Sequence, residues 1–445
     1  MQEDAGLARV IGQRMLIVFI IGDILGAGIY ALVGKLAGHG GGAVWLPLAI
    51  GFVVAGLTAA SYAELVGKYP RAAGAALYTH RAFKRPFFTF LVAFAVMMSG
   101  VASASAAALA FGGNYLAQFV TAPTTLAALG FLAVITLVNF IGISESIKVN
   151  LVLTIVEVTG LLIVIVVGVV GIARGDGDPA RALAFEAPNG ALLGVLGATA
   201  LGFYALLGFE DAVNLAEECH DPHRTFPVAL FTGITITGIV YITIAVIAVA
   251  LVPPARLATS SGPLLDVVNA AGVDFPPELF AAIALLAIGN TALINMIMAS
   301  RLLYGMANER IVPAAFGVIH KRRRTPIVAI AFTVIISAGL IATGNVKQLA
   351  ETTVLLLLVV FAVVNCAVLV LRRRPVEHPH FRTPTWAPVL GAATTLFLAT
   401  PLTGRPAEVY ATAGILVGIG AALWGVNRLV TGRRVTDLDA ERLVK

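Results

Sequence analysis

The chain has 445 residues, of which 59% are hydrophobic and only 12% are charged, and its mean hydropathy is +0.93. No soluble core could bury this much apolar surface, so the composition excludes a soluble globular protein and predicts an integral membrane protein. Membrane topology, with some attraction to anionic membrane lipid, explains the net charge of +6. The charge therefore does not predict a nucleic-acid partner.

Long apolar runs predict twelve membrane-spanning helices, each close to the ~20 residues that cross ~30 Å of hydrocarbon. The runs are continuous, whereas a membrane barrel would show short segments of alternating hydrophobicity, so the predicted fold class is all-α. In chain order, the expected spans are 15–33, 44–63, 88–111, 126–143, 149–172, 192–216, 228–252, 279–304, 327–343, 353–371, 389–402 and 411–427.

The basic residues predict the orientation, because Lys and Arg near the ends of spans are retained on the cytoplasmic side. If the N-terminus is inside, 24 of the 30 Lys and Arg residues fall on inside segments and six fall outside. We therefore expect a multi-pass protein of the cell (plasma) membrane with both termini in the cytoplasm.

Glycines interrupt two of the expected spans, in the segments from Leu25 to Ile29 and from Leu206 to Glu210. Hydrocarbon cannot hydrogen-bond freed backbone groups, so such interruptions are expected only where they line a protein cavity. A pair of them in corresponding positions of two halves points to the binding site of a secondary transporter.

Each interruption would create half-helix ends of opposite polarity. Free N–H groups at the start of a half-helix would bind a carboxylate, and the carbonyl groups that end the preceding one would hold an ammonium group or a cation. A zwitterionic α-amino acid offers both charges. Alternatively, Gly22 and Gly26 form a small-residue packing face and bind nothing. The substrate-binding residues predicted at these ends are Ile24, Leu25, Gly26, Ala27, Gly28, Leu206 and Gly208.

The span 149–172 carries Asn150, Thr154 and Glu157 on one helix face. An acid inside a membrane span is costly and is by default a functional residue. Desolvation favours the neutral form of a buried carboxyl, which makes Glu157 a candidate proton carrier. It could equally be a ligand for Na⁺, together with oxygens from the first span and from Asn290 or Thr291, or a structural residue paired with an asparagine.

Other acids lie close to the interruptions. Asp23 precedes the first one by about a turn and is predicted to attract a substrate amine, to relay protons or to pack against a neighbouring hydroxyl. Glu210 and Asp211 follow the second one, where a negative charge either caps the next half-helix or contacts the ligand. Glu217 and Glu218 are predicted to close an inward gate against the basic segment between the second and third spans.

Polar and aromatic residues on neighbouring spans are candidates for the pocket wall. They are Ser103, Phe203, Tyr204, Ala205 and Asn295. For Ser103 the alternative is close helix packing, which is the commoner use of small residues in membrane helices. His220 and His223 have a spacing that suggests a metal site, but no further ligand beyond Cys219 stands nearby, so no metal and no other cofactor is predicted.

Three sequence segments resemble signatures of amino acid permeases in the amino acid–polyamine–organocation superfamily. GDILGAGIY at residues 22–30 is similar to the first helix of that family, and GFEDAVNLAEE at 208–218 to its sixth helix. RLLYGMA at 301–307 is similar to the end of its eighth helix. Proton-coupled relatives can carry a Lys at about the position of Glu157, so this sequence departs from that pattern by the opposite charge.

The resemblance implies an inverted repeat of five plus five helices (the LeuT-like fold), with helices 1 and 6 broken at a midplane substrate site and two further helices at the end. The corresponding division of the chain is a cytoplasmic N-terminus 1–14, a first repeat 15–172, a second repeat 192–371, helices 11 and 12 at 389–427 and a cytoplasmic tail 428–445.

The sequence thus predicts a secondary active transporter that moves an amino acid or related amine by alternating access, with a proton, or else sodium, as the coupling ion. A polyamine or cationic-amine carrier and an uncoupled exchanger stay open as alternatives, and a substrate sensor or a channel is the alternative from another class. An enzyme is not predicted, because no HExxH, nucleophile elbow or phosphate-binding loop is present.

Overall fold

The computed structural model describes residues 11–70, 74–141, 147–185, 190–323 and 325–431. Most of the predicted N-terminal segment 1–14 and of the tail 428–445 lies outside these residues, as does the end of the predicted span 126–143. The side chains of Asn150 and Glu217 are outside the described part as well.

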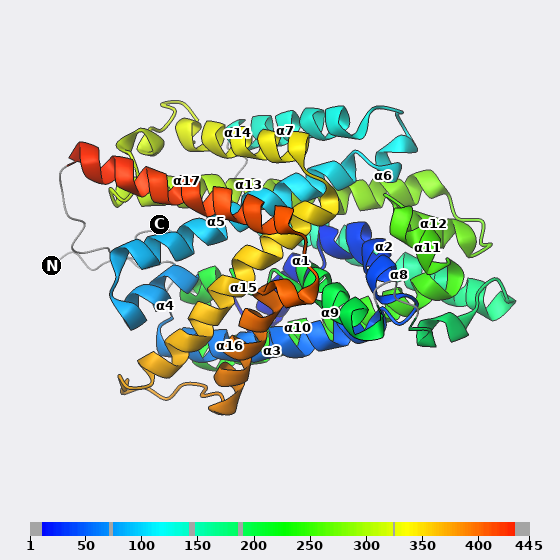
Figure 1. Ribbon diagram of the computed structural model, residues 1–445, viewed down its shortest axis with the longest axis horizontal. Helices are drawn as coiled ribbons and strands as arrows, with labels where there is room; N and C mark the ends of the chain where they lie inside the picture. The colour runs from blue at the N-terminus through cyan, green and yellow to red at the C-terminus, as the bar shows by residue number, and fades with distance from the viewer. Residues whose placement is uncertain (1–10, 71–73, 142–146, 186–189, 324, 432–445) are drawn as a thin grey trace.

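Helices make up the described chain (Figure 1), and the only strand-like pairing in the described ranges is a single bridge between Ile11 and Cys219. The elements are α1 (Gln13–Ile24), α2 (Ala27–Gly40), α3 (Trp45–Lys68), α4 (Gly74–Phe83), α5 (Pro86–Phe111), α6 (Asn114–Ala117), α7 (Thr124–Ile141), α8 (Ile147–Arg174), η1 (Pro179–Leu183), α9 (Ala191–Gly202), η2 (Phe203–Leu206), η3 (Asp211–Glu218), α10 (Pro222–Leu251), α11 (Pro254–Thr259), α12 (Pro263–Ala270), α13 (Pro277–Asn308), η4 (Ala314–Gly317), α14 (Ile327–Thr343), α15 (Val346–Leu371), α16 (Trp386–Ala399), η5 (Pro401–Thr403) and α17 (Ala407–Thr431).

The expected all-α, multi-pass architecture is confirmed. Within the described ranges nine helices are long and apolar enough to cross a membrane, and the bent pair α1 and α2 raises the number to ten. The apolar helices α14 and α16, with 17 and 14 residues, fall on two further expected spans but are shorter than the ~20 residues that cross a bilayer without thinning it. The count of twelve spans therefore stays a prediction.

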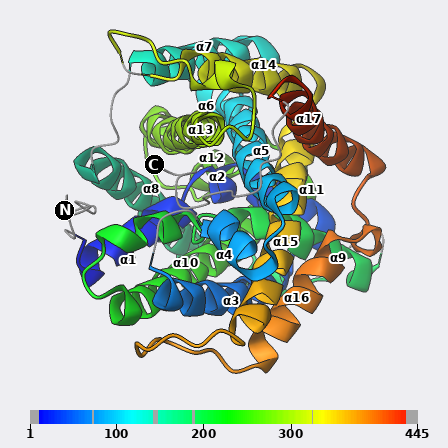
Figure 2. The same ribbon diagram turned by 90° about the vertical axis from the view of Figure 1, so that its left-hand side faces the viewer.

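The helices divide into interior and peripheral ones. The most apolar windows of α15 and of the segment Ala191–Ala216 are 72% buried, whereas those of α7 and α17 are only 22% buried. Figure 2 shows α7 and α17 at the outer edge of the bundle, with α5 and α15 further inside. Buried helices are apolar on all sides, so their few polar groups must be satisfied by other parts of the protein.

One end of the bundle, on the left in Figure 1, carries α4 together with the ends of α3 and α15. Glu64 of α3 is only 2% exposed there and binds the guanidinium of Arg372 through two hydrogen bonds, from Nε at 2.8 Å and from Nη2 at 2.7 Å. The Lys68 ammonium donates to the Leu371 carbonyl at 2.5 Å. We call this end of the bundle, which carries the basic side chains of Lys68 and Arg372, the basic end.

Candidate functional site

The first interruption separates α1 from α2, whose axes differ in direction by 44°. Leu25 leaves the helix, and Gly26 is extended with φ −69° and ψ −153° before Ala27 begins α2. The Tyr241 hydroxyl of α10 donates to the Ile24 carbonyl at 2.6 Å, and the Ala27 N–H donates to Thr291 Oγ1 of α13 at 3.0 Å. Two distant helices thus satisfy one backbone group on each side of the interruption.

The second interruption follows η2. Leu207 is extended with ψ 155°, and Gly208 has φ +120°, a region that only glycine enters without strain. The Gly208 N–H donates to Glu210 Oε2 at 2.9 Å. This contact is a local cap on the turn before Glu210, and the side chain makes no capping hydrogen bond to η3, so both roles predicted for Glu210 stay predictions.

The two interruptions lie against each other in the interior of the bundle. A Cβ added at Gly28 would lie 2.7 Å from Ala205 Cα, and one added at Gly208 would lie 2.7 Å from the Asp23 carbonyl oxygen. At Gly26 the nearest atom would be Thr291 Oγ1, at 2.5 Å. These glycines therefore permit close approach of backbone to backbone, and substrate binding at the same positions stays a prediction.

Close packing also describes Gly22 of α1, which together with Gly26 was predicted as an alternative packing face. A Cβ at this position would overlap the side chain of Thr154 of α8. This contact supports the alternative that small residues in α1 serve helix packing.

Residues predicted for the pocket wall are brought together by α5, η2 and α13. Ser103 Oγ and the Tyr204 hydroxyl are 2.9 Å apart, which links α5 to η2. Asn295 Nδ2 donates to the Thr291 carbonyl at 2.9 Å, and its Oδ1 would lie 3.3 Å from a Cβ at Gly100 of α5. The side chains at these three positions are polar and uncharged, and Phe203 and Ala205 are buried; that the five residues line a substrate pocket stays a prediction.

Glu157 of α8 is 1% exposed and lies next to α13. Its Oε1 accepts a hydrogen bond from Asn290 Nδ2 at 3.2 Å, while Oε2 has no hydrogen-bond partner within the described residues. Its backbone carbonyl accepts from the Tyr30 hydroxyl of α2 at 2.9 Å. The structure therefore joins two of the predicted coupling residues and connects them to the helix that follows the first interruption.

The predicted gate at Glu217 and Glu218 stays a prediction. The Glu218 carbonyl accepts from the Ile11 N–H at 2.9 Å, which anchors the start of the described chain to the end of η3. The Glu217 side chain lies outside the described part.

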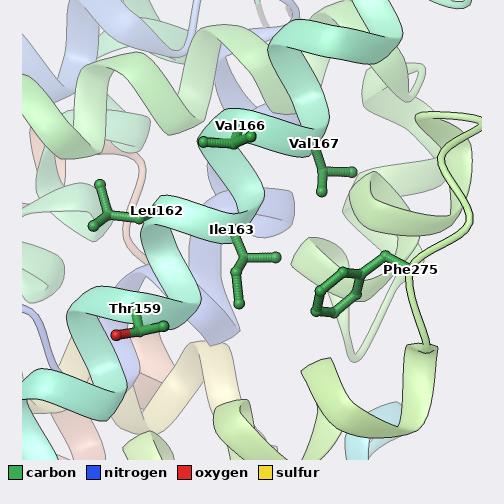
Figure 3. Close-up of a pocket in the computed structure, with 6 residues that line it drawn as sticks. All are labelled: Thr159, Leu162, Ile163, Val166, Val167 and Phe275. Carbon is green, nitrogen blue, oxygen red and sulfur yellow. The ribbon is translucent and has the colours of Figure 1, made fainter.

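A surface groove of about 300 Å³ is distinct from this region (Figure 3). Four residues of α8 that line it, Leu162, Ile163, Val166 and Val167, are aliphatic, and Phe275 closes it from the connection before α13. The hydroxyl of Thr159, its one polar side chain, donates to the carbonyl of Ile155 in its own helix. The lining of the groove is apolar, which favours contact with a hydrocarbon chain, and it offers no group that would bind a charged substrate.

Sequence reasoning missed two tyrosines that hold the site together, Tyr30 and Tyr241. Both are fully buried in apolar runs, so they do not stand out by periodicity. The available signal was chemical, because a tyrosine hydroxyl inside a membrane span needs a hydrogen-bond partner and therefore points to an exposed backbone carbonyl.

Comparison with known proteins agrees with this architecture. The amino acid permease family model matches residues 11–420. The chain is 31% identical to an uncharacterized transporter of Mycobacterium tuberculosis, over 97% of this chain and 94% of that protein. It is 26% identical to a branched-chain amino acid permease of Bacillus subtilis, over 88% of this chain and 87% of that protein. It is also 26% identical to a methylthioribose transporter of Bacillus subtilis, over 89% of each chain.

The family model covers nearly the whole described chain, and the first of these relatives is aligned almost from end to end. Together with the apolar helices, these matches identify a multi-pass membrane transporter. The chain belongs to the amino acid permease family of the amino acid–polyamine–organocation superfamily.

Proposed function

We propose that the protein is a secondary active transporter that moves a neutral α-amino acid across the cell membrane by alternating access. The observation that carries the proposal is the contact between the two chain interruptions, at Gly28 with Ala205 and at Gly208 with Asp23. Two helical segments, α1 and η2, end there, and two others, α2 and η3, begin there. Backbone donors and acceptors are therefore concentrated in the apolar interior. Such a concentration suits a ligand with a carboxylate and an ammonium group.

The same contact supports the five-plus-five inverted repeat. The interruption at Leu25 and Gly26 stands in the first span of the segment 15–172, and the one at Leu207 and Gly208 stands in the first span of the segment 192–371. Corresponding positions in two repeats are where transporters of this architecture bind their substrates. We propose that α14 and α16 complete the count of twelve spans.

The uncharged wall supports a neutral substrate. Ser103, Tyr204 and Asn295 supply hydroxyl and amide groups, which hydrogen-bond to one another or to backbone carbonyls. Relatives are named for branched-chain amino acids, for methylthioribose and for cationic amino acids, so their names leave the charge of the substrate open and the proposal rests on the uncharged wall. We therefore place a neutral amino acid before a polyamine or a cationic amine.

Uptake by the purified, reconstituted protein tests the proposal. We expect saturable accumulation of a labelled neutral amino acid such as leucine, with weaker competition by lysine and putrescine than by unlabelled leucine. Competition led by putrescine would favour an amine carrier. Ion conductance far above carrier turnover, without competition by any of these compounds, would contradict the transporter mechanism.

Glu157 is the proposed proton carrier, because it is a buried carboxyl with one oxygen bonded to Asn290 and one without a partner in the described chain. Glu157→Gln fixes the neutral form at nearly constant shape. We expect accumulation driven by an inward proton gradient to collapse, while exchange of substrate across the membrane partly survives. Glu408→Gln, which removes an exposed carboxyl of α17, is the matched control and should behave as the wild type.

The other roles of Glu157 give different results in the same assay. A sodium ligand would make uptake depend on Na⁺ at fixed pH, and the Glu157→Gln variant would lose that dependence. If Glu157 is purely structural, the Glu157→Gln variant should be less stable than the wild type, and its remaining gradient-driven uptake should keep the wild-type pH profile. Measuring uptake and exchange in acidic and neutral buffer, with Na⁺ or K⁺, separates the three roles.

A further inference from the structure

Five aromatic side chains form a continuous series between the second interruption and the basic end. Their ring centroids are separated by 6.1 Å for Phe203 and Phe361, 5.4 Å for Phe361 and Phe209, and 6.0 Å for Phe361 and Tyr62. Tyr62 lies 6.2 Å from Phe209 and 6.3 Å from Tyr78. We call these five residues the aromatic series.

Each ring belongs to a different part of the fold. Phe203 is in η2, Phe209 follows Gly208, Tyr62 is in α3, Tyr78 is in α4 and Phe361 is in α15. All five side chains are fully buried, even though α4 connects two spans at the basic end. The series therefore joins the chain around the second interruption to the surface elements of that end.

The positions of Tyr62 and Phe361 along their helices show how far the aromatic series lies from the basic end. Tyr62 stands six residues before the end of α3, and Phe361 stands ten residues before the end of α15. At 1.5 Å per residue these residues lie about 9–15 Å from the ends of their helices at the basic end. They therefore lie between the chain around the second interruption and this end.

We propose that the aromatic series is the gate that closes the substrate site from the basic end, and that it opens when Phe361 of α15 separates from Tyr62 and Phe209. This proposal rests on the proposed transport function. Tightly packed aromatic rings exclude water, and water exclusion is sufficient to block ions and polar solutes at an apolar constriction. Phe361 contacts three of the other four rings, so its displacement divides the series.

Tyr78 supplies a second, independent observation. Its hydroxyl is buried and has no hydrogen-bond partner within the described residues. An unpaired buried hydroxyl is unfavourable, and it becomes satisfied when water enters. The unpaired hydroxyl of Tyr78 therefore destabilises the closed gate relative to the open, hydrated one.

Accessibility of a cysteine at the site tests the gate without requiring transport. In a background with Cys219→Ala and Cys366→Ala, Ser103→Cys is labelled by a membrane-impermeant maleimide from either side of oriented vesicles. We expect Phe361→Ala to raise the labelling rate by roughly tenfold, only from the side that holds the basic end. Phe280→Ala removes an equally buried ring that contacts Tyr30 and Tyr115 instead, and it should leave the rate within about twofold.

Equal labelling of the Phe361→Ala and Phe280→Ala variants would overturn the proposal, because ordinary core packing predicts the same effect for both. If Phe361→Ala does not fold, Phe361→Leu provides a smaller truncation with the same expected direction. Tyr78→Phe removes the unpaired hydroxyl and should slow labelling by roughly threefold, since it stabilises the closed form. A faster or unchanged rate in Tyr78→Phe contradicts the role of the hydroxyl.

The labelling result is separable from the proposed function. A wild-type protein that takes up no amino acid would refute the transport function, whatever the labelling rates are. A wild-type protein that transports normally, combined with equal labelling of Phe361→Ala and Phe280→Ala, would refute the gate alone.

Discussion

The interruption between α1 and α2 and the interruption after η2 differ in where their backbone groups find partners. At the first, the Ile24 carbonyl and the Ala27 N–H are bonded by Tyr241 and Thr291, which come from α10 and α13. At the second, the Gly208 N–H is bonded by Glu210, two residues further along the chain. One interruption is held by the rest of the bundle, and the other is held by its own sequence.

This difference has a consequence for motion. A bend that depends on side chains from distant helices changes when those helices move, because its hydrogen bonds are made only in one arrangement. A locally capped turn keeps its shape as a unit. We therefore expect α1 and α2 to change their mutual angle during transport, and the turn at Gly208 to move without changing its internal geometry.

The largest expected effect comes from Gly208→Ala. The residue has φ +120°, and an added Cβ would lie 2.7 Å from the Asp23 carbonyl oxygen, so strain and overlap act together. The strained backbone alone should cost about 1–3 kcal/mol of folding stability. Gly56→Ala of α3 is the control, because no positive φ strains that residue and an added Cβ there would have no heavy atom within 4 Å. Thermal unfolding of both purified variants measures the difference, and equal melting temperatures would contradict it.

The next effect concerns the dependence of the first interruption on α13. Thr291→Val keeps the shape of the side chain but removes the oxygen that accepts the Ala27 N–H, which should cost about 1–2 kcal/mol. Thr291→Ser retains that oxygen and should lose much less. Uptake should fall with the same ranking, since a loosened α2 start misplaces the N–H groups proposed to bind the carboxylate. If the valine and serine variants are equally stable, the hydrogen bond does not hold the interruption.

The positions of the Gly208 and Thr291 variants also show how much of the candidate site the sequence could predict. The positions of both interruptions were visible because glycines in an apolar run break a pattern that hydrocarbon otherwise enforces. The pairing of Glu157 with Asn290 was visible because buried acids need partners. The bond from Ala27 to Thr291 was not, because it joins residues 264 apart and depends on how α13 packs against α2.

Packing also decides features that lie outside any local pattern. Phe203, Tyr62 and Phe361 are ordinary apolar residues in three separate spans, and only their convergence forms the aromatic series. The short lengths of α14 and α16, in contrast, were visible in the sequence: the predicted span 327–343 coincides with α14, and the predicted span 389–402 has the length of α16 but lies three residues further along the chain. Hydropathy indicates which segments lie in the membrane, whereas the packing of neighbouring helices determines their contacts.

The smallest expected effect comes from the local cap at the second interruption. Glu210→Met removes the oxygen that accepts the Gly208 N–H and should lower stability by about 0.5–1.5 kcal/mol. Glu210→Gln retains an acceptor oxygen and removes the charge, so a residue that only caps the turn should tolerate this change within about 0.5 kcal/mol, with normal substrate affinity. If Glu210 instead contacts the substrate ammonium, the glutamine variant should keep its stability and lose affinity, because a neutral amide attracts an ammonium group less than a carboxylate does. Substrate-induced shifts in melting temperature, measured for wild type, Glu210→Gln and Glu210→Met, decide between the two roles. A loss of affinity without a loss of stability in Glu210→Gln would show that the second interruption, although locally held, uses its capping residue for the ligand.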